Sequence, residues 1–420
     1  MISGMGTGGQ PGPVSLRCRF CYDARMAITI HGAGCALMDY LYSNVDFTHD
    51  AVVGLLRRRP GDGGLTIGGL VFAEALERFA GRKIDAILES VVGSREANRE
   101  NVGGPAIVSL IHTAQICEEA DVRFFGAVGD DEAGRSLRAI AGQTPLDISR
   151  LAVRPGATAA TYVLSDPDYA DGHGERMFVN QLGVAADLSP EDLGPDFPRA
   201  DIVQLGGTAL VPRLHEAIPR LLREARAAGA LTVVNTVYDF RAESARPEER
   251  WTLGNDEAYP LVDLLIADAE EALRLSGCDD AARAVSWFLE RGTGAAVITN
   301  GPGPVAFGAG SGRFAGCGVG SRPVFTEFAK REEVRSAGGD TTGCGDTFAG
   351  GLVAGIASQL ASSGPGARVD LDAALRLAIA SGAFCLTHLG GTWLEESAGE
   401  KAARVASIRS EYERIHGGRR

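Results

Sequence analysis

The feature that most restricts the fold of this chain is a regular alternation of strand-like and helix-like segments. Short apolar runs, typical of buried strands, alternate with segments whose apolar residues recur at helical spacing. Alternation of this kind predicts an α/β fold with a mostly parallel central sheet and helices on both faces. The predicted strands are 201–205, 231–235, 263–267 and 295–299, and the predicted helices are 213–228, 281–291, 371–389 and 400–414.

Length, charge and cysteine usage narrow the class of protein. The chain has 420 residues, 45% of them hydrophobic, which is enough for one large domain. A net charge of −13 argues against nucleic acid or an anionic membrane as the main partner. No apolar run is long enough for a membrane span. We expect residues 1–25, rich in Gly and Pro, to be a disordered leader and residues 26–420 to form the domain. The eight cysteines form no complete zinc motif, which is typical of a reducing, cytoplasmic environment.

A glycine-rich stretch, "SAGGDTTGCGDTFAGGL" at 336–352, stands directly before an apolar segment with helical spacing. The small residues Gly343, Cys344 and Gly345 therefore fall at a helix N-terminus, where unpaired amides and the helix dipole favour an anion such as phosphate. Asp346 lies in the same turn. It is interpreted as a base that accepts a proton from an attacking hydroxyl, with its pKa near the ordinary value of about 4. A plain helix-capping role for Asp346 is the alternative.

Phosphate handling cannot rely on a P-loop here, because no Gly-x-x-x-x-Gly-Lys-Ser/Thr motif is present. The chain contains only three lysines, Lys83, Lys330 and Lys401. Backbone amides, arginines or a metal ion are left to hold any phosphate.

Two further segments interrupt the alternation. Residues 158–182 read as two strands joined by an Asp/Gly-rich turn, which predicts an antiparallel hairpin. Residues 50–100 are rich in glycine and charge and show one helical patch, so they receive no assignment.

Together these motifs resemble the ribokinase-like family, the phosphofructokinase-B type carbohydrate and nucleoside kinases. "GGDTTGCGDTFAGGL" resembles the C-terminal signature of that family, and "VGGPAIVSLIHTA" followed by "FFGAVGDDEAG" resembles its N-terminal signature. The resemblance runs from about residue 27 to 395. It implies a mostly parallel sheet flanked by helices, with a small β-strand lid drawn from 40–102 and 158–182.

The resemblance also implies roles for single residues at the acceptor side. Asp346 matches the catalytic base, and Gly343, Cys344 and Gly345 match the turn that stabilises the transferred phosphoryl group. The residues that match the substrate side are Asp39, Gly103, Gly104 and, from the hairpin, Arg176. Each has a structural alternative: Asp39 as a turn acid, the glycine pair as a helix start, and Arg176 as a surface arginine of the lid.

At the nucleotide side, Thr299, Gly301 and Thr342 match residues that border ATP. Glu271 and Asp268, in "ADAEEA", match the family's Asn-x-x-Glu element near Mg²⁺. An ordinary first helical turn is the alternative for these two acids. The implied cofactors are ATP and Mg²⁺, with a monovalent cation as an option.

The sequence departs from the family at the substrate end. Val108 stands where a substrate-binding Asn is usual, and "VVNTVYDFR" lacks the common Asp-x-Asn. The sequence therefore defines the type of reaction better than it defines the substrate.

The leading functional hypothesis is an ATP-dependent kinase that phosphorylates a hydroxymethyl group of a sugar or sugar derivative. An adenosine-like nucleoside kinase and a non-catalytic sugar sensor on the same scaffold are the two rivals. A Rossmann dehydrogenase is disfavoured because "HGAGCALMD" lacks Gly-x-Gly-x-x-Gly. The partner is a small molecule, and a homodimer through the lid is expected because exposed strand edges invite pairing.

Overall fold

The computed structural model describes residues 27–417 except 44, 60, 94, 95, 173, 174, 311, 338 and 340. The predicted leader, 1–25, lies outside the described residues. No helix of the described part combines the length and apolar composition needed to cross a bilayer.

The larger of two sheets has nine strands in the order β14-β13-β12-β11-β10-β9-β1-β5-β6. All neighbours from β12 to β6 pair in parallel, and only β13 and β14 are antiparallel at one edge. The strands are β1 (Ile28–Gly34), β5 (Ala120–Gly129), β6 (Asp147–Arg154), β9 (Ile202–Gly206), β10 (Leu231–Asn235), β11 (Leu264–Asp268), β12 (Ala295–Thr299), β13 (Val305–Ala309) and β14 (Cys317–Arg322). The predicted mostly parallel sheet is confirmed.

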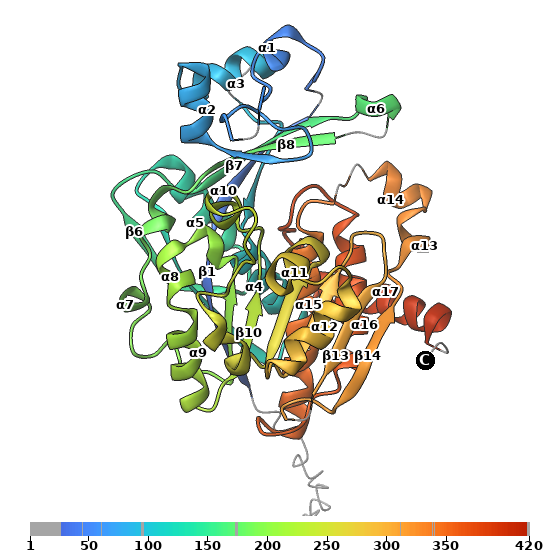
Figure 1. Cartoon of the computed structure of the whole chain (residues 1–420). Helices are drawn as coiled ribbons and strands as arrows, with labels where there is room; N and C mark the ends of the chain where they lie inside the picture. The colour runs from blue at the N-terminus through green and yellow to red at the C-terminus, as the bar shows by residue number, and fades with distance from the viewer. Residues whose placement is uncertain are drawn as a thin grey trace, which may run out of the picture.

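Helices cover both faces of this sheet, and each face has its own core of buried apolar side chains (Figure 1). One face carries α4 (Pro105–Ile116), α5 (Glu132–Ala141), α15 (Cys344–Ser363), α16 (Leu371–Cys385) and α17 (Glu400–His416). The other carries α8 (Pro212–Glu216), α9 (Ile218–Ala227), α11 (Ala269–Ser276) and α12 (Ala281–Glu290).

Two predicted helices differ in their limits. The predicted helix 213–228 is divided into α8 and α9, because Pro219 lies in the first turn of α9, where its missing amide is tolerated. The predicted helix 371–389 ends at Cys385, and the chain then continues without regular structure to α17. Short helical segments complete the fold: α7 (Pro190–Leu193), α10 (Phe240–Ala245), α13 (Thr326–Ala329), α14 (Glu332–Ser336), and 3-10 turns at Gly183–Asp187, Thr208–Leu210 and Asp256–Leu261.

A second, five-stranded sheet stands above the carboxyl ends of the large one (Figure 1), in the order β3-β8-β7-β2-β4. Its strands are β2 (Leu37–Tyr42), β3 (Leu70–Phe72), β4 (Arg99–Gly103), β7 (Ala160–Asp166) and β8 (Glu175–Gln181), with α6 (Tyr169–Gly172) between the last two. β7 and β8 pair antiparallel, so the predicted hairpin is confirmed. A second small sheet of this kind is consistent with the expected lid.

The segment 50–100, which the sequence left unassigned, mainly covers one face of the small sheet. It contains α1 (Asp50–Val53), α2 (Ala73–Ala80) and α3 (Ile84–Val92), together with β3 and the start of β4. Apolar side chains of these helices pack on the small sheet in a third, separate core, which includes Tyr42, Leu76, Ile87, Met177 and Val179. The small sheet therefore has a core of its own on this face, although Met38 of β2 and Val102 of β4 also join a core of the large sheet.

This separation of cores predicts independent local stabilities. Leu76 of α2 is fully buried in the small-sheet core, so Leu76→Ala should cost about 2–5 kcal/mol. Hydrogen exchange should accelerate in α2, β7 and β8 but stay slow in α15 and α16. Leu352→Ala, in the large-sheet core, is the control and should accelerate exchange in α15. Uniform acceleration over the whole chain by Leu76→Ala would contradict two separable cores.

Candidate active site

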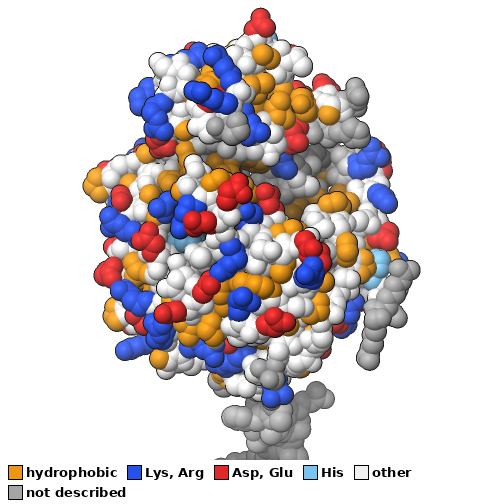
Figure 2. Space-filling view, in the orientation of Figure 1, with side chains coloured by type: hydrophobic (Ala, Val, Ile, Leu, Met, Phe, Trp, Pro, Cys, Tyr) orange, Lys and Arg blue, Asp and Glu red, His pale blue; other side chains and the backbone are white. Residues whose placement is uncertain are grey.

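A pocket of about 430 Å³ opens where parallel strands of the large sheet end. Figure 2 shows the hollow between the small-sheet part and the large body. β10, β11 and β12 contribute their last residues, and the N-terminal turns of α4 and α15 also line the pocket. Ligands of open α/β sheets bind at this end of the strands. The lining residues are Pro105, Arg176, Phe178, Asn235, Thr236, Val237, Ile266, Ala267, Asp268, Glu271, Thr299, Thr341, Thr342, Gly343, Gly345 and Asp346.

The glycine-rich turn does begin a helix, as the sequence predicts. Gly343 is the N-cap of α15, with φ at +81°, and a Cβ there would collide with the backbone of Gly391. The amide of Cys344 donates to Thr341 O (3.2 Å), whereas the amide of Gly345 donates to no residue that the structure describes. This amide and the dipole of a 20-residue helix point positive charge at the pocket.

Asp346 occupies the first turn of α15 and lines the pocket. Burial, reinforced by the neighbouring Cys385 thiol group, raises the pKa of Asp346 to about 7. The sequence suggested an ordinary value near 4. The difference arises because the half-buried carboxyl group, in the first turn of α15, lies among protein atoms that solvate the charged form poorly.

Asp268 and Glu271 cap α11 reciprocally. The amide of Glu271 donates to Asp268 Oδ1 (2.8 Å), and the amide of Asp268 donates to Glu271 Oε2 (3.2 Å). Thr236 Oγ1 also donates to Glu271 Oε2, and Glu271 is only 7% exposed. Burial and the adjacent Asp268 carboxylate raise the pKa of Glu271 to about 8. The structural alternative, a capped first turn, is therefore realised, but in a position that faces the pocket.

These two acids suit Mg²⁺. No group of three or more His, Cys, Asp or Glu side chains converges on one point among the described residues. Mg²⁺ on a nucleotide needs only one or two carboxylates, because phosphates and water supply the other ligands. The raised pKa of Glu271 marks a carboxylate that lacks positive charge nearby, and a divalent cation would supply it.

Asp39 lies on β2 of the small sheet and is 7% exposed. Its carboxylate packs against Gly103, where a Cβ would collide with it, so glycine is required at this position. Gly104 is the N-cap of α4 with φ at +104°. The carboxylates of Asp39 and Asp346 both raise the pKa of the buried Cys35 thiol, which burial already raises, to about 12. The two predicted acids therefore flank one buried thiol, although Asp39 lies in the small sheet and Asp346 in a helix of the large body.

Arg176 comes from β8 of the small sheet and reaches the glycine-rich turn. Its guanidinium donates to Thr342 Oγ1 (2.6 Å) and Thr341 Oγ1 (2.7 Å) and lies over the ring of Phe178. The alternative from the sequence was a surface arginine of the lid, whereas the structure places the Arg176 side chain on the pocket wall.

The remaining predicted residues divide into two groups. Thr299, at the end of β12, and Thr342 line the pocket. Gly301 lies in the turn after Thr299, with φ at +50°, and is not among the lining residues. Val108 is buried, and its side chain packs against Gly391.

Sequence reasoning missed Asn235 and Thr236, which follow each other at the end of β10 and line the pocket. The available signal was a polar pair directly after the apolar strand "LTVV". It passed unnoticed because the segment departs from the expected Asp-x-Asn pattern. Phe178 was also missed, since a strand aromatic resembles a core residue until the register of the sheet is known.

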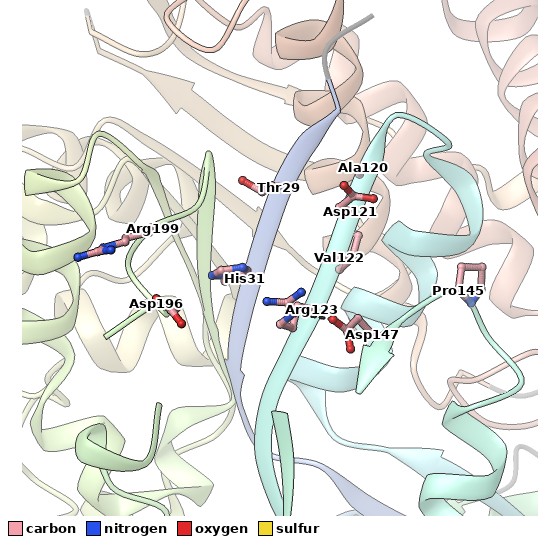
Figure 3. Close-up of a pocket in the computed structure, with 10 residues that line it drawn as sticks. All are labelled: Thr29, His31, Ala120, Asp121, Val122, Arg123, Pro145, Asp147, Asp196 and Arg199. Carbon is pink, nitrogen blue, oxygen red and sulfur yellow. Dashed lines mark hydrogen bonds and ion pairs between the residues drawn. The ribbon is translucent and has the colours of Figure 1, made fainter. Parts of the chain in front are cut away.

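A second hollow, of about 460 Å³, lies near the amino ends of β1 and β5 (Figure 3). His31 Nδ1 is 3.0 Å from Phe197 O, Arg123 pairs with Asp147, and Asp196 pairs with Arg150. Three of its charged side chains, Arg123, Asp147 and Asp196, are thus held in ion pairs, and none of the predicted site residues lines it. The pocket at the carboxyl ends of the strands is therefore the candidate active site.

Comparison with known proteins agrees with this geometry. The sequence profile of the pfkB family carbohydrate kinases matches residues 79–397. A fructokinase of Klebsiella pneumoniae is 29% identical over 246 residues, which are 57% of this chain and 72% of the fructokinase. An aminoimidazole riboside kinase of Salmonella typhimurium is 27% identical over 242 residues, 55% of this chain and 66% of that kinase.

Solved structures show the same ribokinase-like fold. An adenosine kinase from Sinorhizobium meliloti superposes with a TM-score of 0.62 at 20% identity, covering 90% of this chain and 99% of that one. A ribokinase from Thermotoga maritima superposes with a TM-score of 0.56 at 16% identity, covering 91% and 99%. Since the family profile matches well over half of the sequence, this chain belongs to the pfkB family of carbohydrate kinases.

Proposed function

We propose that this kinase transfers the γ-phosphoryl group of ATP to a hydroxymethyl group of a sugar or sugar derivative. The observation that carries the proposal is Asp346, held with a raised pKa at the N-terminus of α15 in the same pocket as Arg176 and Glu271. A carboxyl group with a pKa near neutrality is matched to a general base.

The chemistry follows from this placement. The carboxylate of Asp346 accepts the proton of the acceptor hydroxyl as the phosphoryl group is transferred. The amide of Gly345 and the dipole of α15 stabilise the negative charge of the transferred group, and Arg176 adds a guanidinium from the small sheet. Bound Mg²⁺, for which Glu271 and Asp268 are the ligands that the site offers, would neutralise phosphate charge.

Asp39 is proposed to hold hydroxyl groups of the acceptor. Its carboxylate lies against Gly103 and shares the Cys35 neighbourhood with Asp346. A substrate that touches both acids therefore has at least two hydroxyl groups, one oriented by Asp39 and one that reacts beside Asp346. Sugars meet this requirement directly.

A nucleoside acceptor is the second candidate. Solved adenosine kinases share the fold, and one curated relative is named an aminoimidazole riboside kinase. Phe178, on the pocket wall beside Arg176, is an aromatic surface on which a base could stack. A ribose also carries the hydroxymethyl group and the vicinal hydroxyls that Asp39 requires.

The sugar sensor without catalysis is the weaker reading. It rested on Val108 in place of a polar residue and on the altered segment "NTVYDF". Val108, however, points into the interior against Gly391, and Asn235 and Thr236 of that segment line the pocket. This replacement leaves Asp346 and the turn of α15 in place, so a lost contact at Val108 removes no catalytic group.

The small sheet is proposed to act as the lid, and the chain to work in the cytoplasm. Pairing of two lids would have to use strand edges, since α1, α2 and α3 cover one face of this sheet. The proposed homodimer is therefore one in which the two lids pair through their strand edges.

A panel of hexoses, pentoses and nucleosides, assayed for ADP formation with Mg²⁺ and ATP, tests the activity. We expect turnover with at least one free sugar and a lower kcat/KM with every nucleoside. A higher kcat/KM with nucleosides would select the second candidate. No turnover with any compound, while the protein still binds a sugar by calorimetry, would support the sensor.

Asp346→Asn tests the base. The substitution keeps the shape of the side chain and the helix start, but it removes the proton acceptor, so kcat should fall about 10²–10⁴-fold. Affinity for ATP should be unchanged or slightly higher, because a negative charge near the phosphates is lost. If Asp346 had only a structural role, as the predicted cap or, since Gly343 is the N-cap, as an acid of the first helical turn, Asn would replace it at little cost, and kcat would stay within about threefold of the parent value.

The same variant tests the raised pKa without any activity measurement. With a pKa of about 7 folded and about 4 unfolded, the parent carboxyl destabilises the fold increasingly as pH rises through this window. Asn does not titrate, so the thermal midpoint of Asp346→Asn should exceed that of the parent by a margin that grows from pH 5 to pH 8. A margin that does not change with pH would contradict a raised pKa of Asp346.

A further inference from the structure

One of the three lysines of this chain is buried completely. Lys401 of α17 is 0% exposed, whereas the side chain of Lys83 is 85% exposed and Lys330 lies at the surface. Lysine is almost never fully buried without a partner. Burial lowers the pKa of Lys401 to about 7, which shows that its charge is poorly solvated there.

The ammonium group of Lys401 begins a short chain of hydrogen bonds. Lys401 Nζ donates to Gln115 Oε1 (2.7 Å), and Gln115 Nε2 donates to the carbonyl oxygen of Trp393 (2.9 Å). Gln115 belongs to α4 and is itself 5% exposed. The lysine thus fixes the orientation of the Gln115 amide, and the amide fixes the backbone at Trp393.

Residues 386–393, which follow α16 in the connection to α17, are called the strap here, and Trp393 is its last residue. Asn101 of β4 donates its Nδ2 group to the carbonyl oxygens of Leu389 (3.2 Å) and Thr392 (3.1 Å). Thr392 Oγ1 donates back to Val102 O (2.9 Å). One side of the strap is therefore bound to the strand that leads into the Gly103–Gly104 pair.

The other side of the strap contacts the turn that begins α15. Gly343 and Gly391 approach so closely that a Cβ on Gly343 would collide with Gly391. Directly before the strap, Cys385 Sγ donates to Thr342 O (3.3 Å). A displacement of the strap would displace Gly343, and with it the amide of Gly345 and the carboxyl of Asp346.

We propose that Lys401 is a positioning residue, which holds the strap through Gln115 and thereby holds the turn of α15 in its reactive geometry. This inference rests on the proposed phosphoryl transfer by Asp346. Stability alone does not account for the lysine, since an apolar side chain of similar length would fill the same space without the cost of burying a charge. What an apolar residue could not do is orient Gln115.

Lys401→Met separates positioning from stability. The thermal midpoint should change little, because removal of a buried charge offsets the loss of the donor to Gln115 Oε1. The value of kcat should fall about tenfold, because a small displacement of reacting groups is costly, while KM for ATP and for the sugar stays within about twofold. Affinity for ADP with aluminium fluoride, a mimic of the transferred phosphoryl group, should fall in parallel with kcat. Arg414→Met, on the exposed side of α17, is the control and should change none of these values.

Gln115→Glu breaks the second link of the chain and leaves the first intact. Glu still accepts from Lys401, so folding is preserved, but it has no N–H group for Trp393 O. We expect a loss of kcat similar to that of Lys401→Met, and no further loss when the two substitutions are combined. Hydrogen exchange of residues 386–393 should accelerate in both variants, and this measurement does not depend on activity.

The outcomes distinguish this inference from the proposed function. An active parent with unchanged kcat in Lys401→Met and Gln115→Glu would overturn the positioning role alone. A parent without kinase activity would overturn the proposed function, and exchange in the strap that is unaffected by both substitutions would overturn the mechanical link as well. A lower thermal midpoint with full kcat would make Lys401 merely structural.

Discussion

The contact between the backbones of Gly343 and Gly391 is the constraint on which the rest of the active site depends. It brings the strap against the turn that begins α15, and no side chain fits between them. The left-handed conformation of Gly343 then directs the chain into the helix, so that Asp346 and the Gly345 amide face one pocket. The glycines of this turn are therefore required by the close approach of two backbones, and a flexible loop would not serve.

The balance of charge in this pocket depends on the ligands that it binds. Three acids, Asp346, Glu271 and Asp268, share a pocket in a chain with a net charge of −13. Burial raises the pKa of Asp346 and of Glu271, so both carboxylates lack nearby positive charge. Among the described residues that line the pocket, Arg176 is the one cationic side chain that a polyanionic nucleotide would meet, and the N-terminus of α15 adds partial positive charge. A cation that accompanies the phosphates relieves both problems, which is the physical reason for expecting Mg²⁺ here.

Sequence patterns predicted those parts of the structure that local periodicity determines. The parallel sheet, the hairpin 158–182 and the helix after Gly343 all follow from spacing within short segments. The helical patch seen within 50–100 corresponds to α2, but α1 and α3 received no assignment, because their apolar residues are organised by contact with strands far away in sequence, such as β7 and β8. The burial of Lys401 could not be predicted either. The helix 400–416 is rich in charge, and only the packing of α17 against α4 and α16 shows that this lysine faces inward.

The two sheets divide the acceptor chemistry between them, and this division decides how the enzyme must work. Asp39 belongs to the small sheet and Asp346 to the large body, yet a substrate must touch both acids. The four places where the chain passes between the two parts contain Gly34, Gly104, Gly156 and Gly183, all with positive φ. The small sheet has its own core, yet Met38 of β2 and Val102 of β4 also pack into the core of the large body, and Arg176 adds hydrogen bonds to Thr341 and Thr342. The same arginine faces the phosphate side of the pocket. A bound phosphate that replaced the threonine hydroxyls as partner of Arg176 would couple occupation of the nucleotide site to the distance between the two acids.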